Sequence, residues 1–305
     1  MSIAAAILPK GRNGFGYASS AEQVTEGLDL HGKTYVLTGC NSGLGFETLR
    51  VLGLRGAHVI AAARSLKKAE NALVKSGSDG TPVVCELSEP ESVRACVQSI
   101  KDMGRPVDAI LCNAGIMALP DLQLAHGYEL QFLTNHIGHF ILVTGLLEQL
   151  RDDGRVVMTS SVAYKQAPKN GIDFDNLKGE KKYKPWQAYG RAKLANLLFA
   201  CELSKKFKGS QRSAFSLHPG VIMTGLERHL SPMMRLAMTI AKPLFFKNVA
   251  QGAATQTYLA TQPGLQQYSG QYFADCNPAT ATPQVGDEAL ARELWRVSEQ
   301  IVATL

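Results

Sequence analysis

The stretch Thr34-Tyr-Val-Leu-Thr-Gly-Cys-Asn-Ser-Gly-Leu-Gly45 decides the fold of this chain. Its first five residues are β-branched or apolar, which predicts a short buried strand. Gly39 then allows a tight turn, Gly43 lets the backbone approach a pyrophosphate, and Gly45 permits close packing of a helix against the strand. The helix expected from Gly43 to Leu54 presents free N–H groups at its start, and such groups bind phosphate.

Short apolar runs and segments of helical periodicity alternate through the rest of the chain. Further strands are expected at residues 57–63, 82–87, 107–112, 155–159 and 213–217, and helices at 65–75, 89–103, 127–150 and 187–206. Strands that alternate with helices form parallel sheets with right-handed crossovers. We therefore predict a single-domain α/β fold, a doubly wound Rossmann-type parallel sheet of about seven strands with helices on both faces.

The start of the chain and one insertion depart from this alternation. Residues 1–30 are predicted to form an N-terminal arm with a short helix to about Gly27, opened by a capping box of Ser19 and Glu22. Residues 31–305 are assigned to the Rossmann-type domain, and residues 162–184 within it to an irregular, basic insertion. Residues 1–18 are too polar for a membrane-anchoring helix.

The composition excludes several classes of protein. Of the 305 residues, 45% are hydrophobic and 19% are charged, as in an ordinary globular protein. The net charge of +6 is not gathered in a dense basic stripe, so no nucleic-acid partner is expected. Six cysteines without CxxC spacing favour buried free thiols in a reducing compartment. With no transmembrane segment and no metal-ligand cluster in the sequence, we expect a cytoplasmic protein that holds no metal.

The end of the second expected strand bears on the choice of cofactor. Dinucleotide-binding folds that take NAD place an acidic residue there to bond the ribose 2′-OH. Here Ala61-Ala-Ala-Arg64 has no acid, and Arg64 can form a bidentate contact with a 2′-phosphate. A solvated arginine at the start of a helix is the alternative. We expect NADP(H) rather than NAD(H).

A tyrosine and a lysine four residues apart carry the catalytic prediction. Tyr189 and Lys193 form a YxxxK and share one face of an expected helix. An ammonium beside a phenol is expected to lower the pKa of the phenol from about 10 towards the working pH. Such a tyrosine can give a proton to a carbonyl oxygen or remove one from an alcohol.

Two further polar positions are placed to join this pair. Ser161 follows the fifth expected strand, at the edge where open α/β sheets bind ligands, and its hydroxyl can stabilise charge on a substrate oxygen. Ser160 is the alternative, and one of the two serines is expected to cap a turn. Asn135 lies in the middle of an expected helix, where an amide indicates either a polar role or a helix break.

Taken in order, these motifs resemble the short-chain dehydrogenase/reductase family. The resemblance covers about residues 30–275 and rests on TGxxxGxG at 38–45, Asn113-Ala-Gly115, Asn135, Ser161, YxxxK at 189–193 and Pro219-Gly220. The stretches Asn135-His-Ile-Gly-His-Phe140, Asp173-Phe-Asp-Asn-Leu177 and Tyr272-Phe-Ala-Asp-Cys276 resemble the retinol-dehydrogenase-like branch. Glu86 stands where most relatives have Asp, so the adenine contact is expected to differ in detail.

The resemblance implies a role for each of these residues. Asn135 would anchor a proton-relay water, and Ser161 would polarise the substrate carbonyl. Tyr189 would transfer the proton, and Lys193 would also hold the nicotinamide ribose. The implied cofactor-binding residues are Gly39, Asn41, Ser42, Gly43, Leu44, Gly45, Arg64, Glu86, Leu87, Asn113, Ala114, Gly115, Tyr189, Lys193, Pro219, Gly220, Val221, Ile222 and Thr224.

The segment at about 222–250 is rich in methionine and other apolar residues. Methionines adapt to irregular apolar shapes, and the resemblance assigns substrate recognition to this part of the chain. We therefore predict a lid over a lipophilic or aromatic substrate, with an amphipathic helix packed on the core as the alternative. His136, His139 and His218 are expected to be structural.

The chain is thus predicted to be an NADP(H)-dependent carbonyl reductase, reversible as an alcohol dehydrogenase, that acts on a ketone or aldehyde. A non-catalytic NADP(H)-binding sensor or scaffold is the alternative, because a fold alone does not decide function. A sugar-nucleotide epimerase fits less well, since such relatives usually have another glycine spacing. Whether the protein forms a homodimer is left open.

Overall fold

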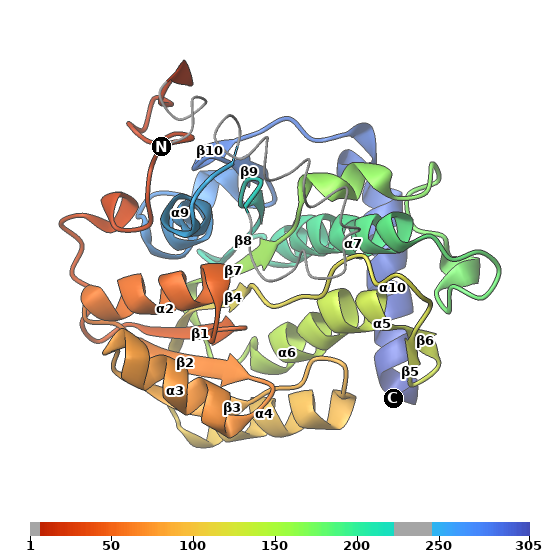
Figure 1. Ribbon diagram of the computed structural model, residues 1–305, viewed down its shortest axis with the longest axis horizontal. Helices are drawn as coiled ribbons and strands as arrows, with labels where there is room; N and C mark the ends of the chain where they lie inside the picture. Colours follow the sequence, from red (N-terminus) through yellow and green to blue (C-terminus); the bar gives the residue numbers. More distant parts are fainter. Residues whose placement is uncertain (1–6, 223–245) are drawn as a thin grey trace.

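The fold is seen in a computed structural model that describes residues 7–222 and 246–305 (Figure 1). One sheet of eight strands crosses the molecule in the order β10-β9-β8-β7-β4-β1-β2-β3. These strands are β1 (Thr34–Thr38), β2 (His58–Ala63), β3 (Gly80–Val84), β4 (Val107–Cys112), β7 (Leu150–Thr159), β8 (Ser213–His218), β9 (Tyr272–Ala274) and β10 (Asn277–Pro278). Every neighbouring pair is parallel except β9 with β10. The predicted doubly wound α/β class is confirmed, with one strand more than expected.

Helices cover both faces of the sheet. Apolar side chains of α4 (Pro90–Asp102), α6 (Gly138–Leu146), α7 (Pro185–Lys206) and α10 (Glu288–Thr304) form the core on one face. Those of α2 (Gly43–Leu54), α3 (Leu66–Ser76) and α9 (Val249–Thr261) form the core on the other. Because both faces are covered, β1 is buried at all five positions, as a central parallel strand requires.

Smaller elements complete the described chain. A two-stranded sheet of β5 (Leu124–Ala125) and β6 (Tyr128–Glu129) precedes α5 (Leu130–Phe132). Short turns of helix occur at η1 (Gln23–Thr25), η2 (Leu133–Ile137), η3 (Val162–Gln166), η4 (Phe174–Asn176), η6 (Gln266–Tyr268) and η7 (Pro283–Gly286). Between Val162 and Lys184 the chain is irregular apart from two such turns, as predicted for the insertion.

Two strands begin earlier than the sequence predicts. β3 begins at Gly80 rather than Pro82, and Gly80 pairs with Val59 so closely that a Cβ there would lie only 2.2 Å from the Val59 carbonyl oxygen. β3 ends at Val84, so Glu86 follows the strand instead of lying near its end. β7 begins at Leu150 rather than Arg155. A register shift against β4 absorbs this irregular start.

The helix predicted over residues 127–150 is broken. Its first part is strand β6, and the carboxylate of Glu129 then caps α5 by accepting the N–H groups of Gln131 and Phe132. The next turn, η2, is a π-helix that contains Asn135, and α6 ends at Leu146. The sequence shows one apolar helical run here because the break is made by contacts with distant residues.

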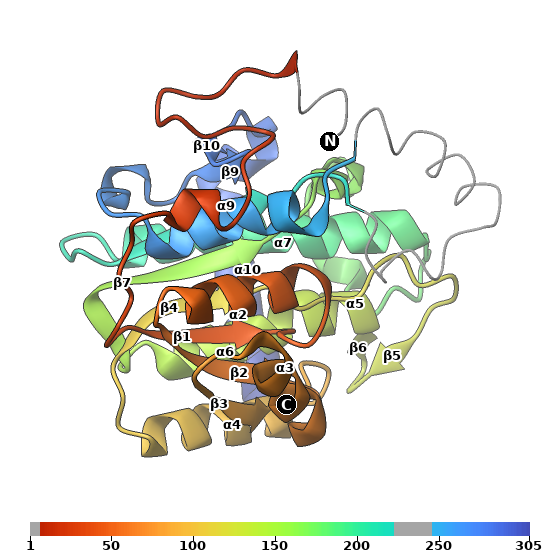
Figure 2. The same ribbon diagram turned by 60° about the vertical axis from the view of Figure 1, so that its left-hand side comes forward.

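The N-terminal arm is also more extended than predicted. The capping box joins Ser20 and Gln23, one position after the expected pair: Ser20 N–H donates to Gln23 Oε1 (2.9 Å) and Gln23 N–H to Ser20 Oγ (3.3 Å). The helix it opens is the single 3₁₀ turn η1. Figure 2 shows this arm crossing α9, where Ala21 N–H donates to the carbonyl of Ala250 (2.9 Å).

Two further expectations concern the cysteines and the membrane-spanning character of the helices. All six cysteines are free thiols, and all but Cys201 are buried, as predicted. Within residues 7–222 and 246–305, no helix has both the length and the apolar character that crossing a membrane requires.

Helix α10 is held on the α6–α7 layer mainly by Trp295. Its ring stacks on Phe199 of α7 (centroids 5.4 Å apart) and meets Phe140 of α6 edge-on at 5.0 Å. We expect Trp295→Ala to lower the free energy of unfolding by about 3–5 kcal/mol, because it leaves a cavity among these rings.

Urea unfolding monitored by circular dichroism measures this change. Arg292→Ala, at an exposed position of the same helix, is the matched control and should stay within about 0.5 kcal/mol of the parent. An equal loss in the two variants would contradict the assigned packing.

Candidate active site

The turn between β1 and α2 has the shape of a phosphate-binding loop. Gly39 and Gly43 have φ of 69° and 54°, a region that favours glycine. A Cβ at Gly45 would lie 2.1 Å from the carbonyl oxygen of Gly39, so only glycine lets the helix approach this closely. Ser42 precedes α2 without a capping bond from its side chain, which leaves the first N–H groups of the helix free for an anion. Asn41 and Ser42 are exposed beside them.

The loop after β4 is tied to the end of β1 and reaches the catalytic candidates. Asn113 donates its amide Nδ2 to the carbonyl of Thr38 (2.9 Å), and the N–H groups of Asn113 and Ala114 both donate to Thr38 Oγ1 (3.0 Å each). A Cβ at Gly115 would lie 2.9 Å from Asn135 Oδ1 and 3.4 Å from Lys193 Nζ. The structure therefore brings this loop, Asn135 and Lys193 together.

Asn135 is fully buried in the π-helical turn η2. Its Oδ1 accepts the N–H of Ile116 (2.8 Å), and its Nδ2 donates to the carbonyl of Ile116 (2.9 Å). The side-chain amide thus pairs with one backbone unit just beyond the Asn113–Gly115 loop. Both sequence interpretations hold for this residue, since it marks a helix break and serves a polar contact.

Ser160 and Ser161 lie just beyond β7 and have different partners. Ser160 is buried, and its hydroxyl donates to the carbonyl of Lys193 (2.7 Å), which ties β7 to α7. Ser161 caps η3 by accepting the N–H of Ala163 (3.2 Å), and its hydroxyl lies near enough to Tyr189 to lower the pKa of the phenol. The serine predicted to act on substrate is therefore the one beside the phenol.

The acidity expected of Tyr189 is not found. Burial raises the pKa of Tyr189 to about 12, and the nearby hydroxyl of Ser161 offsets only part of this increase. Lys193 Nζ donates to the carbonyl of Thr159 (3.0 Å) and lies 5.7 Å from the centroid of the phenol ring. Burial lowers the pKa of Lys193 to about 8. The predicted lowering by the ammonium is wrong here because burial is the largest influence on the pKa of Tyr189 and the influence that lowers this pKa comes from Ser161, so the phenol is protonated at neutral pH.

Three predicted cofactor contacts lie at the β2–β3 side of the sheet. Arg64 directly follows β2 and is exposed, and no described residue forms an ion pair with it. The carboxylate of Glu86 accepts the hydroxyl of Ser88 (3.0 Å), which is a local contact. Leu87 is buried against α6, where a Cβ on Gly138 would lie 2.3 Å from the Leu87 carbonyl oxygen.

The loop after β8 meets the phosphate-binding loop at α9. A Cβ at Gly252 would lie 2.3 Å from Ile222 Cδ1 and 2.7 Å from Leu44 Cδ2, so both side chains pack on this glycine. In the same loop Pro219 is buried, Gly220 has φ of 97°, and Val221 is exposed. Thr224 and most of the predicted lid lie outside the described residues.

Sequence reasoning missed two buried polar contacts. Gln256 of α9 donates its amide to Thr48 Oγ1 (2.6 Å) and to Asn113 Oδ1 (3.2 Å), joining three elements around the dinucleotide loop. Arg191, inside the YxxxK motif, forms an ion pair with Glu129 (3.4 Å) although both side chains are almost fully buried. The position of a charged residue, Arg191, between Tyr189 and Lys193 could have indicated the ion pair with Glu129. No feature of the sequence pointed to the contacts of Gln256.

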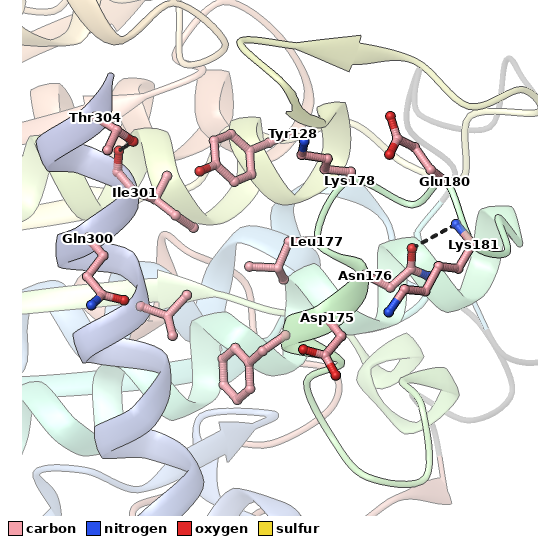
Figure 3. Close-up of a pocket in the computed structure, with 12 residues that line it drawn as sticks. Tyr128, Asp175, Asn176, Leu177, Lys178, Glu180, Lys181, Gln300, Ile301 and Thr304 are labelled. Atoms are coloured by element: carbon pink, nitrogen blue, oxygen red, sulfur yellow. Dashed lines mark hydrogen bonds between the residues drawn. The ribbon is translucent and has the colours of Figure 1, made fainter.

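A hollow of about 410 Å³ lies elsewhere, between α10 and the insertion. Figure 3 shows Tyr128, Leu177 and Ile301 around it, with Lys181 N–H donating to Asn176 Oδ1 (3.1 Å) on its rim. None of the predicted catalytic or cofactor-binding residues lines this hollow. The convergence of Asn135, Ser161, Tyr189 and Lys193 at the carboxyl edge of the sheet, where open α/β folds bind ligands, therefore defines the candidate active site.

The chain is similar to a known family, to two characterised relatives and to one solved structure. Residues 33–174 match the family model described as short chain dehydrogenase. The chain is 39% identical to the short-chain dehydrogenase TIC 32 A, chloroplastic, of Brassica napus, over 97% of this chain and 96% of that protein. It is 37% identical to human retinol dehydrogenase 14, over 90% and 88% respectively. A crystal structure of an uncharacterised protein from Mycobacterium paratuberculosis superposes with a TM-score of 0.75 at 31% identity, covering 92% of this chain and 97% of that one.

Two histidines buried beside this site make stability depend on pH. Burial lowers the pKa of His136 to about 3 and that of His139 to about 4. The unfolded chain takes up these protons near pH 6.5, whereas the folded protein keeps both rings neutral. Between pH 6.5 and 4 the unfolded state therefore binds more protons, and the free energy of unfolding falls as the pH drops.

Urea unfolding measured from about pH 7 to about pH 4.5 tests this. His136→Asn should be less stable than the parent at neutral pH. Its free energy of unfolding should fall less steeply as the pH drops, by up to about 1.4 kcal/mol per pH unit. Parallel pH curves for the parent and the variant would contradict the neutral state of His136.

Proposed function

The chain belongs to the short-chain dehydrogenase/reductase family, in its retinol-dehydrogenase-like branch, and on that premise we propose that it is an NADP(H)-dependent reductase of lipophilic or aromatic ketones or aldehydes. Membership of the family makes it an oxidoreductase. The cofactor, the reaction direction and the class of substrate are the proposed parts.

The approach of Ser161 to Tyr189 is the observation that carries the proposal. Ser161 caps η3, and α7 packs so closely on η3 that a Cβ at Gly190, next to Tyr189, would lie 2.6 Å from the Ala163 carbonyl oxygen. This approach sets two hydroxyl groups together at the carboxyl edge of β7, where a single carbonyl oxygen can accept from both. Two donors on one oxygen stabilise the negative charge that develops there during reduction. A protein that only sensed a dinucleotide would not need this pair.

The protonation state of Tyr189 supports reduction as the working direction. A phenol whose pKa lies well above neutral arrives with its proton and can give it to the substrate oxygen as charge builds up. Lys193 lies one helical turn further along α7, and its ammonium can stabilise the phenolate that remains. Asn135 Oδ1 and Lys193 Nζ both lie beside Gly115, so Asn135 can help return a proton to the phenol by way of water.

The residues around the carboxyl edge fit a dinucleotide. Gly39 and Gly45 leave no room for a Cβ, Gly43 has φ of 54°, and the free N–H groups at the start of α2 suit a pyrophosphate. Arg64, exposed after β2, is suited to a 2′-phosphate, and this supports NADP(H) over NAD(H). When bound, the nicotinamide supplies the hydride that reduces the carbonyl carbon.

Apolar side chains near the hydroxyl pair support a lipophilic substrate. Val162 and Val221 are each 42% exposed, although both are large and apolar. The N–H of Val162 donates to His218 Nδ1 (3.2 Å), so the loops that follow β7 and β8 meet here. The ring of Trp186 stands edge-on to Tyr189 with centroids 6.1 Å apart. A cytoplasmic location and a lid over 222–250 remain predictions of the sequence.

Tyr189→Phe tests the role of the phenol. The variant should lose turnover by at least about 1,000-fold, because the proton donor is gone, while it keeps NADPH affinity within about threefold. Turnover is followed by NADPH absorbance with retinal and with aryl ketones as probes, and affinity by isothermal titration calorimetry. Turnover near that of the parent would remove Tyr189 from its assigned role.

Arg64→Gln tests the choice of cofactor. Loss of the guanidinium should weaken NADPH binding by about 10- to 100-fold and leave NADH binding within about twofold, because only NADPH carries the 2′-phosphate. Both dissociation constants are measured by calorimetry. Lys67→Gln, on the following turn, is the control and should change NADPH affinity much less. An equal change for the two cofactors would exclude a 2′-phosphate contact.

A further inference from the structure

His139 is a fully buried histidine that connects two parts of the site. It lies one helical turn after Asn135, at the start of α6, and its Nδ1 is 3.0 Å from the backbone carbonyl oxygen of Asn135. Its Nε2 is 2.9 Å from Oγ1 of Thr38, at the carboxyl end of β1. One imidazole thus spans the dinucleotide-binding strand and the helix that carries Asn135.

The partners of this ring fix the position of every proton. A carbonyl oxygen only accepts, so Nδ1 carries the hydrogen. Burial lowers the pKa of His139 to about 4, so the ring is neutral and Nε2 is an acceptor. Thr38 must then donate to Nε2, and its lone pairs accept the N–H groups of Asn113 and Ala114. The other acceptor near that hydroxyl, the carbonyl of Leu111, is more distant at 3.4 Å.

We propose that His139 is a positioning residue that couples the loop of Asn113–Gly115 to the backbone of Asn135 through Thr38. The side chain of Asn135 is already held by Ile116, and the bond from His139 holds its backbone carbonyl as well. The catalytic part of this inference rests on the proposed function, whereas the proton arrangement does not.

His136 supplies a matched control on the same helix. It is equally buried, but its Nε2 pairs with Ser298 Oγ of α10 (2.9 Å), and its ring packs against Phe132. Within the part of the chain that the structure describes, its hydrogen bond and ring contacts reach neither β1 nor the loop of Asn113–Gly115. Substitution of His136 should therefore cost stability without disturbing catalysis.

The first experiment reads the proton arrangement directly. Nitrogen-15 NMR of the histidine-labelled full-length protein at neutral pH should show His139 as the neutral tautomer with hydrogen on Nδ1. The resonance is assigned by its loss in a His139 variant. A tautomer with hydrogen on Nε2, or a protonated ring, would overturn the proposal. This readout needs neither cofactor nor substrate, so it stands even if no carbonyl compound is reduced.

The second experiment separates the two hydrogen bonds. His139→Asn keeps a donor near the place of Nδ1, and His139→Gln keeps an acceptor near the place of Nε2, whereas His139→Leu keeps neither. We expect kcat to fall by about 10- to 100-fold in all three variants, because each breaks at least one of the two bonds that link Thr38 to Asn135, with KM for the carbonyl within about threefold.

The controls decide between positioning and general support of the fold. His136→Asn should lower the melting temperature by a similar amount and leave kcat within about twofold of the parent. If His139→Leu does not fold, the Asn and Gln variants decide. A kcat near that of the parent in either of those two variants, or a fall in kcat in His136→Asn as large as in the His139 variants, would overturn the role of His139. If the parent reduces none of the probes, the proposed function fails, and the NMR result alone decides the proton arrangement.

Discussion

The site depends on how closely helix α2 can approach the strand that precedes it. At Gly45 the helix backbone comes so near the carbonyl of Gly39 that a methyl group could not be placed between them. That approach puts the start of α2 beside the loop after β4, which in turn contacts Asn135 and Lys193. With a side chain at Gly45, the start of α2 would move away from the loop that carries Asn113. Binding of a phosphate and alignment of the catalytic residues therefore share one steric requirement.

Local sequence was sufficient to predict the bounds of a segment wherever its own apolar pattern determines which residues are buried. The bounds of β1, α2 and β4 agree with the prediction, because apolar runs and a glycine turn determine them. The helix expected over 127–150 failed for the opposite reason. Its break depends on Asn135 pairing with Ile116 and on Gly138 fitting beneath Leu87, and no short-range pattern reports these contacts. The cap that Glu129 gives α5 is local, and the sequence interpretation overlooked it.

The residues of the candidate site were easier to predict than their chemistry. Motif order was enough to identify Ser161, Tyr189 and Lys193, which the fold brings together. The pKa of Tyr189 could not be predicted, because it depends on how deeply the phenol is buried and on where the lysine points. The contacts of Gln256 were hidden as well, since this glutamine lies 143 positions from Asn113 and carries no recognisable motif.

The last strand of the sheet has a consequence for association between molecules. β10 is two residues long, and its second residue, Pro278, has no N–H to offer a further strand. Its first residue, Asn277, donates its side-chain amide to the carbonyl of Phe15 in the N-terminal arm (3.1 Å). At this end the sheet therefore lacks the regular row of donors and acceptors on which another polypeptide could build. Edge-to-edge polymerisation, a common hazard of open sheets, is discouraged here by one proline and a strip of the chain's own N-terminus.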